Sequence, residues 1–89
     1  MTATPVAAPE DQARTTTLAL LAARTPGATV CPSEVARAID PGTGGDWRAA
    51  MPIVHRAIDR LLEDGLIGLS WKGRTLTHRA GPYRIGHRA

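Results

Sequence analysis

Positively charged side chains are the residues of this chain whose chemistry is easiest to recognise, and most of them lie in its C-terminal half. Residues 1–46 hold three arginines against five acidic residues, a net charge of −2, whereas residues 47–89 hold eight arginines or lysines against three acids, a net charge of +5. This asymmetry favours an anionic partner such as nucleic acid. The alternative is a merely solvated surface, because ten arginines to one lysine also suits a GC-rich genome.

Seven residues are candidate DNA contacts because they lie on a predicted basic helix, on a predicted hairpin or just beyond it. They are Arg48, His55, Arg56, Arg60, Lys72, Arg74 and Arg79. In a helix that enters the major groove, residues near the N-terminal end approach the base edges, and Arg56 is suited to two hydrogen bonds with guanine. Lys72 and Arg74 flank a glycine and are suited to holding phosphates.

The same residues also have a plainer interpretation. Asp59 and Glu63 lie at helical spacing from Arg56 and Arg60, which favours a solvated helix face with local ion pairs. Lys72 has an equivalent alternative, because a lysine near an exposed strand edge keeps that edge soluble.

Residues that could support catalysis or metal binding do not form a recognisable set. The single cysteine, Cys31, has no second cysteine with which to bind a metal or form an intrachain disulfide, and it is expected to cap or pack at a helix start. Ser33 and Ser70 have no histidine and acid at a suitable spacing, and the three histidines are irregularly spaced. We therefore expect no enzyme, no catalytic residue, no cofactor, no metal and no small-molecule substrate.

Length and composition favour one small domain. The chain has 89 residues, of which 43% are hydrophobic but only 3% aromatic, so its core must be thin and aliphatic. A homodimer or a protein partner is as compatible with such a core as a monomer is. The N-terminus does not resemble a signal peptide and no window reaches the length of a membrane span, which predicts a cytoplasmic protein with no membrane partner.

The most regular hydrophobic pattern predicts a long helix over residues 46–64. Its apolar residues recur at three- and four-residue steps and form one stripe: Trp47, Met51, Val54, Ile58 and Leu61. Asp46 is a suitable N-cap and Gly65 a suitable stop. Pro52 predicts either a kink or, slightly favoured, a short turn over 47–51 followed by a helix that begins near Pro52.

The remaining elements follow from turn and capping signals. The predictions are a disordered tail over 1–10, a helix over 11–24, a short bridge to the later hairpin within 28–30, a helix from Pro32 to Ile39, a loop over 40–45, hairpin strands over 66–71 and 74–77, and a short last strand within 81–85. Together they predict a mainly α protein with a small β-hairpin. The specific architecture is a winged helix-turn-helix: three helices plus a two- to three-stranded antiparallel wing, spanning residues 11–86 and followed by a tail over 87–89.

The chain also resembles a known family through an ordered set of short segments. They are residues 31–37, Trp47-Arg48 with Met51, then Val54, Arg56 and Ala57, residues 65–67, residues 72–74 and residues 81–85. This order is similar to that of a small bacterial family catalogued as a domain of unknown function within the winged helix-turn-helix superfamily. The resemblance covers roughly residues 11–86. It implies the fold and implies no activity, and His55 with Ile58-Asp59 departs from its pattern.

The function predicted from these observations is binding of double-stranded DNA by helix 46–64 and the basic wing. The alternative is a winged-helix module that dimerises or docks on a protein without binding DNA, because the fold alone does not decide function. A contiguous exposed patch of Leu62, Leu66 and Leu69 would favour the alternative.

Overall fold

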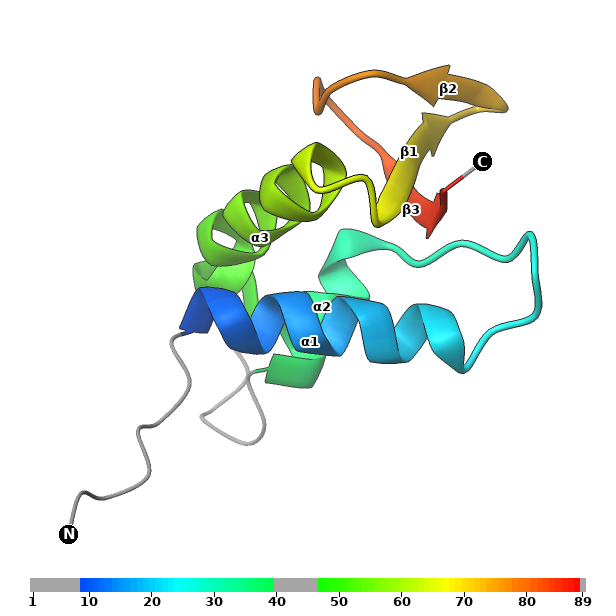
Figure 1. Ribbon diagram of the computed structural model, residues 1–89. Coiled ribbons are helices and arrows are strands. Elements are labelled where there is room, and N and C mark those ends of the chain that lie inside the picture. The colour runs from blue at the N-terminus through cyan, green and yellow to red at the C-terminus, as the bar shows by residue number, and fades with distance from the viewer. Residues whose placement is uncertain (1–8, 40–46, 89) are drawn as a thin grey trace, which may run out of the picture.

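The computed structural model describes residues 9–39 and 47–88. Within these ranges the chain forms three α-helices, a 3-10 turn and a three-stranded antiparallel sheet (Figure 1). The elements, in chain order, are α1 (Pro9–Ala22), α2 (Pro32–Ile39), η1 (Trp47–Ala50), α3 (Met51–Glu63), β1 (Ile67–Trp71), β2 (Arg74–Leu76) and β3 (Arg84–His87). The predicted class, mainly α with a small β-hairpin, is confirmed, and the arrangement is compatible with a winged helix.

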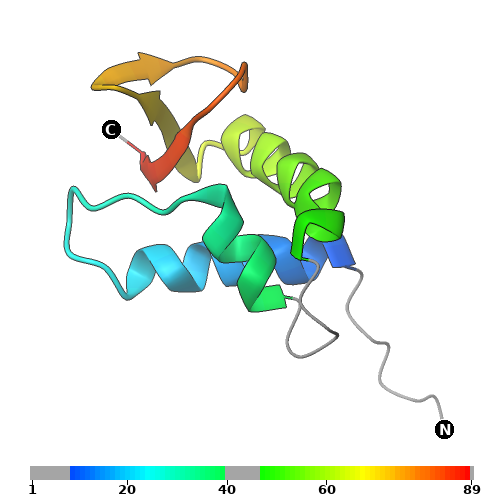
Figure 2. The same cartoon turned by 180° about the vertical axis from the view of Figure 1, so that it is seen from behind.

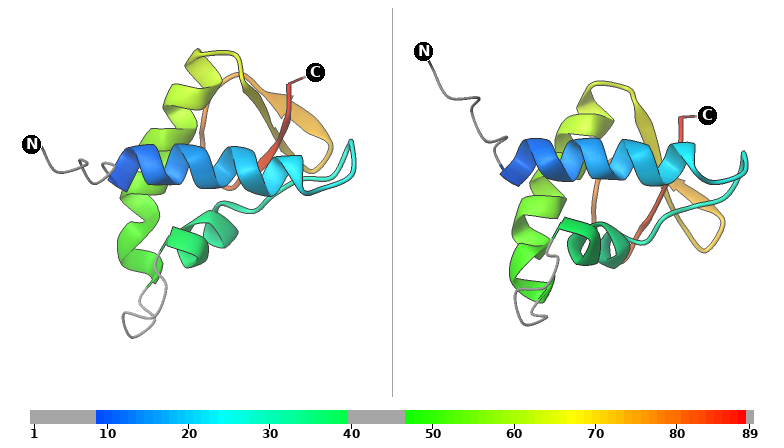
Figure 3. Two further views of the ribbon diagram at one scale, coloured as in Figure 1. Left: turned by 60° about the horizontal axis from the view of Figure 1, so that its bottom comes forward. Right: turned by 90° about the horizontal axis from the view of Figure 1, so that it is seen from below.

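The core lies between the three helices and one face of the sheet. From α3 it receives Val54, Ala57, Ile58 and Leu61, all without exposed surface, which confirms the central part of the predicted stripe. Trp47 and Met51, at the start of that stripe, pack against the core but remain partly exposed. Helix α1 crosses both other helices, as the views in Figures 2 and 3 show.

The long helix predicted over residues 46–64 is divided near Pro52, because a proline is not tolerated in the interior of a regular helix. Residues Trp47–Ala50 form the 3-10 turn η1, and α3 begins at Met51 with Pro52 in its first turn. Pro52 is tolerated there because first-turn amides have no partner within the helix. The favoured alternative, a short turn followed by a helix, is confirmed. The predicted stop at Gly65 is confirmed too: this residue has φ +72°, and the Leu66 amide closes the helix end by donating to the Leu61 carbonyl at 3.0 Å.

The sheet has the order β2-β1-β3, with both neighbours antiparallel to β1. Lys72 and Gly73 form the predicted turn between β1 and β2, with φ angles of +49° and +80°. Beyond β3 the sheet is extended by one isolated bridge, in which Val30 and Ile85 exchange backbone hydrogen bonds of 2.7 and 2.8 Å. The bridge expected within residues 28–30 therefore exists, but it joins the last strand rather than the β1–β2 hairpin.

Four elements have boundaries that differ from the sequence prediction by a few residues. Helix α1 begins at Pro9 and ends at Ala22, two residues earlier at each end than expected, so Pro9 and Glu10 are helical rather than part of the tail. The last strand runs from Arg84 to His87 instead of lying within 81–85. The hairpin strands are each slightly shorter than predicted. The predictions for residues 1–8, for the loop over 40–45 and for the Asp46 cap lie outside the described residues.

Among the described residues, no helix has both the length and the apolar character needed to cross a lipid bilayer.

Candidate nucleic-acid interface

Two arginines pack against the ring of Trp47, in η1 just before α3. The guanidinium carbon of Arg37, from the last turn of α2, lies 4.7 Å from the Trp47 ring centroid, and that of Arg48 lies 4.6 Å from it. Both arginines are exposed. Each cation is attracted by the negative face of the indole, which offsets part of the repulsion between two like charges. The structure thus brings together a predicted residue, Arg48, and Arg37, which was not among the candidates; we call these three side chains the Trp47 cluster.

Arg56 and Arg60 lie farther along α3 and are both exposed. The Arg56 side chain is 64% exposed, and its Nε atom lies 3.8 Å from a Glu10 carboxylate oxygen. This distance exceeds that of a hydrogen bond, so the ion pair is loose and costs little to separate. Local pairs of Arg56 and Arg60 with Asp59 and Glu63 were the plainer alternative, and no such ion pair occurs in the structure as described.

Lys72 and Arg74 lie at the other end of the molecule, on the tip of the β1–β2 hairpin. Both are exposed, and the Lys72 ammonium lies 6.0 Å from the Trp71 ring centroid. Figures 1 and 3 show this tip extending away from α3, whereas η1 lies at the N-terminal end of α3, far from the hairpin. The fold therefore does not bring the wing cations beside the Trp47 cluster.

The two remaining candidates, His55 and Arg79, are occupied by contacts within the protein. Arg79 donates two hydrogen bonds to Asp59, of 3.0 and 3.1 Å, and His55 Nδ1 lies 2.7 Å from the Tyr83 hydroxyl. Burial, and secondarily the nearby Arg79 charge, lower the pKa of His55, while Asp59 opposes that shift. Both side chains are therefore engaged, at least in part, by contacts within the protein.

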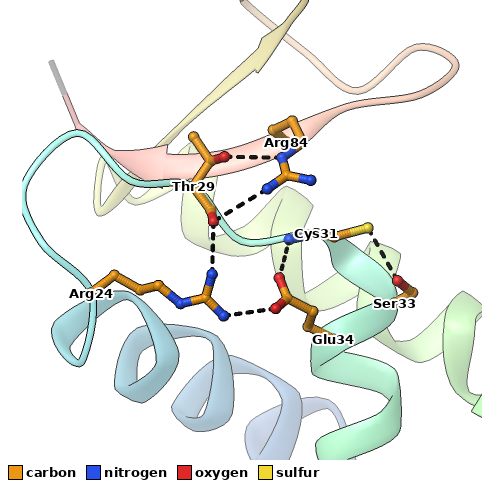
Figure 4. Close-up of polar contacts among 6 residues, drawn as sticks. All are labelled: Arg24, Thr29, Cys31, Ser33, Glu34 and Arg84. Carbon is orange, nitrogen blue, oxygen red and sulfur yellow. Dashed lines mark hydrogen bonds and ion pairs between the residues drawn. The ribbon is translucent and has the colours of Figure 1, made fainter.

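A group of polar contacts joins the segment after α1, the first turn of α2 and β3 (Figure 4). Arg24 donates to a Glu34 oxygen at 2.7 Å and to the Thr29 carbonyl at 3.1 Å, and Arg84 donates to the Thr29 hydroxyl at 2.9 Å. The second Glu34 oxygen accepts the Cys31 amide at 2.7 Å, which caps α2. The hydrogen bond from Arg24, then that from Cys31, lower the pKa of Glu34 against a smaller opposing effect of burial.

Cys31 is half-buried at the start of α2, where its thiol lies 3.1 Å from the Ser33 hydroxyl. This is the position predicted from the sequence. Within the residues that the structure describes, no group of three or more histidine, cysteine or carboxylate side chains is arranged to hold a metal ion.

Leu62, Leu66 and Leu69 do not form the contiguous exposed patch that would have favoured a protein partner. Leu66 is 48% exposed, but Leu69 is only 2% exposed and Leu62 is packed against the core. Two further large apolar side chains are partly exposed, Leu18 at 38% and Trp71 at 37%.

Comparison with known proteins adds one family match. The chain has no match among curated proteins. A family model described as "Protein of unknown function (DUF3253)" matches residues 10–88, from the start of α1 to just beyond β3. Because this match covers nearly the whole described chain, the protein belongs to the DUF3253 family.

Proposed function

We propose that this protein binds double-stranded DNA in the bacterial cytoplasm, with the N-terminal end of α3 at the duplex. The observation that carries the proposal is the Trp47 cluster, which holds two exposed guanidinium groups where α3 begins. In helix-turn-helix proteins the start of the third helix is the part that approaches the groove.

Charge at this end of α3 supports a phosphate contact. No described carboxylate lies within ion-pair distance of Arg37 or Arg48, in contrast to Arg14, Arg24 and Arg79, each of which has an acidic partner. When a guanidinium group binds a DNA phosphate, counterions condensed on the DNA are released, and this release drives binding. Contact with the Trp47 ring orients both groups before DNA arrives and so lowers the entropy lost on binding.

The other cations have separate roles in this proposal. Arg56 and Arg60 lie one turn apart on α3 and are available, since the loose contact of Arg56 with Glu10 is easily exchanged. Lys72 and Arg74 would hold phosphates at a distance from the Trp47 cluster, as a wing does along a duplex. His55 and Arg79 are left out of the interface because Tyr83 and Asp59 occupy them.

The test is binding of a labelled random-sequence duplex to an Arg37→Gln, Arg48→Gln double variant, measured by fluorescence anisotropy. We expect affinity to fall by about tenfold or more, and the slope of log affinity against log salt to decrease in magnitude by about 1.8. The two single variants, Arg37→Gln and Arg48→Gln, are each compared with Arg14→Gln, which also removes one charge, but from an arginine already paired with Asp64 at 3.0 Å. A double variant whose affinity and salt slope equal those of Arg14→Gln would refute a role for the Trp47 cluster.

A protein-docking module is the second candidate, and the exposed Leu66 is the observation in its favour. Sedimentation of the unmodified protein and of Leu66→Ser tests this candidate. If the protein is a dimer, if Leu66→Ser makes it a monomer and if the protein binds no duplex, the docking proposal replaces the DNA proposal.

A further inference from the structure

A trough with a volume of about 330 Å³ lies on the side of the sheet opposite the core. Ile67 and Ile85 point into the core, so Gly68 and Gly86, the next residues on β1 and β3, face the other way. These two glycines are directly opposite each other in the β1–β3 register and form the floor. The rest of the lining comes from the loop before Val30, from β1 and β2, and from the end of β3: Gly27, Ala28, Thr29, Leu69, Ser70, Thr75, His87 and Arg88.

Gly86 keeps this trough open although folding does not require a glycine there. Its φ angle lies outside the left-handed region, and an added Cβ would lie 3.7 Å from the Thr29 Cγ2 atom, an ordinary contact. Glycine weakens a strand and often marks a place where a ligand or another backbone approaches closely. Gly68 differs, because its Cβ would come within 3.2 Å of the His87 carbonyl oxygen, so packing alone accounts for that glycine.

The surroundings of the trough are positively charged. Arg88 lines it, and Arg84 lies across from Ser70 on the same face and holds Thr29 in the wall. The Thr29 carbonyl accepts from two guanidiniums, Arg24 at 3.1 Å and Arg84 at 3.4 Å, with one carboxylate, Glu34, bound to Arg24 beside them (Figure 4). No described acidic residue lines the trough itself.

We infer that the trough binds a small ligand that combines a flat ring with a carboxylate or phosphate group. Neither Gly68 nor Gly86 has a side chain, and Gly86 has no close backbone neighbour above it, so a flat ring can lie against the strand there. The Arg88 guanidinium, at the end of the trough near Gly65, is suited to receive the anionic group. The Ser70 and Thr75 hydroxyls, which are paired in the β1–β2 register, lie at the other end and can hydrogen-bond to polar atoms of the ring. The volume is at the lower end of the range for small-molecule sites, about 300 to 1,000 Å³. This inference does not rest on DNA binding.

The experiment is a backbone-amide NMR titration of the full chain with three probes: adenosine monophosphate, salicylate and inorganic phosphate. We expect at least one of the two ring-bearing probes to shift the amides of Gly68, Ser70 and Gly86 most, and phosphate alone to bind about tenfold more weakly or worse. Tighter binding of adenosine monophosphate than of adenosine, or of salicylate than of phenol, shows that the phosphate or the carboxylate is recognised.

Two variants test the site itself. Gly86→Val fills the floor and should abolish these shifts, while Ala19→Val, on the exposed side of α1, should leave them unchanged. Arg88→Gln should lower the affinity for the ring-bearing probe that binds by about tenfold. This variant tests the site even if Gly86→Val does not fold. Either of two results would overturn the inference. The first is that neither ring-bearing probe shifts the amides of the trough. The second is that Gly86→Val and Arg88→Gln both show the shifts and the affinity of the unmodified protein.

Discussion

Asp59 and Arg79 form two parallel hydrogen bonds that fasten the segment after β2 to the middle of α3. Four residues farther along that segment, Tyr83 reaches His55, one turn earlier on α3. These two contacts cover the middle of the helix with the protein's own chain. The part of α3 that remains open is its N-terminal end and the side of Arg56 and Arg60, which is why the proposed DNA contacts concentrate there.

The Asp59–Arg79 pair is expected to contribute modestly to stability. Its geometry is that of a two-point guanidinium–carboxylate contact, but both side chains are more than a third exposed, so solvent screens much of the attraction. A double-mutant cycle with Asp59→Asn and Arg79→Gln, measured by urea unfolding, should give a coupling of about 0.5 to 1 kcal/mol. Additive effects of the two substitutions would contradict the contact.

His55 should titrate below its usual value of 6.5, first because it is partly buried and then because Arg79 is near. Its depressed pKa means that the folded protein binds fewer protons than the unfolded chain near pH 6.5. Stability is therefore fully present above that pH and declines as the pH falls through it. Imidazole NMR signals give the midpoint directly, and His55→Gln should flatten the pH dependence of the urea midpoint. A titration midpoint of His55 at or above pH 6.5 would contradict the burial of its side chain near Arg79.

Tyr83 should resist ionisation as long as the protein is folded. It is 4% exposed, and burial raises its pKa above the usual 10.0. Because the folded state holds the phenolic proton more tightly than the unfolded chain, stability should decrease as the pH rises beyond 10. The chain has a single tyrosine, so phenolate absorbance near pH 10 reports this residue alone. Half-ionisation at pH 10 in protein that remains folded by circular dichroism would disprove its burial.

Glu34 should stabilise the start of α2 through the Cys31 amide and the Arg24 guanidinium. Glu34→Gln is expected to cost about 0.5 to 1 kcal/mol at neutral pH, the size of a helix-capping contact. Since the pKa of Glu34 is lowered from 4.5, the carboxylate contributes above that pH, and its contribution disappears as the pH falls through the folded-state pKa. Urea unfolding of both proteins at neutral pH and at about pH 3 measures this, and a difference that persists undiminished in acid would argue against it.

The local signals in the sequence were sufficient for most of the fold. The stripe from Val54 to Leu61 gave the buried side of α3, Pro52 marked its first turn, and Gly73 marked the hairpin. These features are decided by backbone geometry and by side-chain periodicity over a few residues, both of which a sequence displays directly. The two-residue shift of α1 reflects helix ends, where such signals are weakest.

The candidate site was predicted less completely, because its contacts join residues that are distant along the chain. Nothing in the spacing of Arg79 indicates that it pairs with Asp59, twenty positions earlier. Arg37 was not recognised as a candidate because only the packing of α2 against η1 places it on Trp47. The number of cations can be read from the sequence, but the carboxylates that pair with them depend on the fold.

The most direct measurement of the central proposal is the affinity of the unmodified protein for a random duplex at two salt concentrations, about 50 and about 200 mM. The proposal predicts binding at the lower concentration and a steep loss at the higher one, with a log–log slope of magnitude about 2 or more. Absence of binding at the lower salt concentration would contradict it.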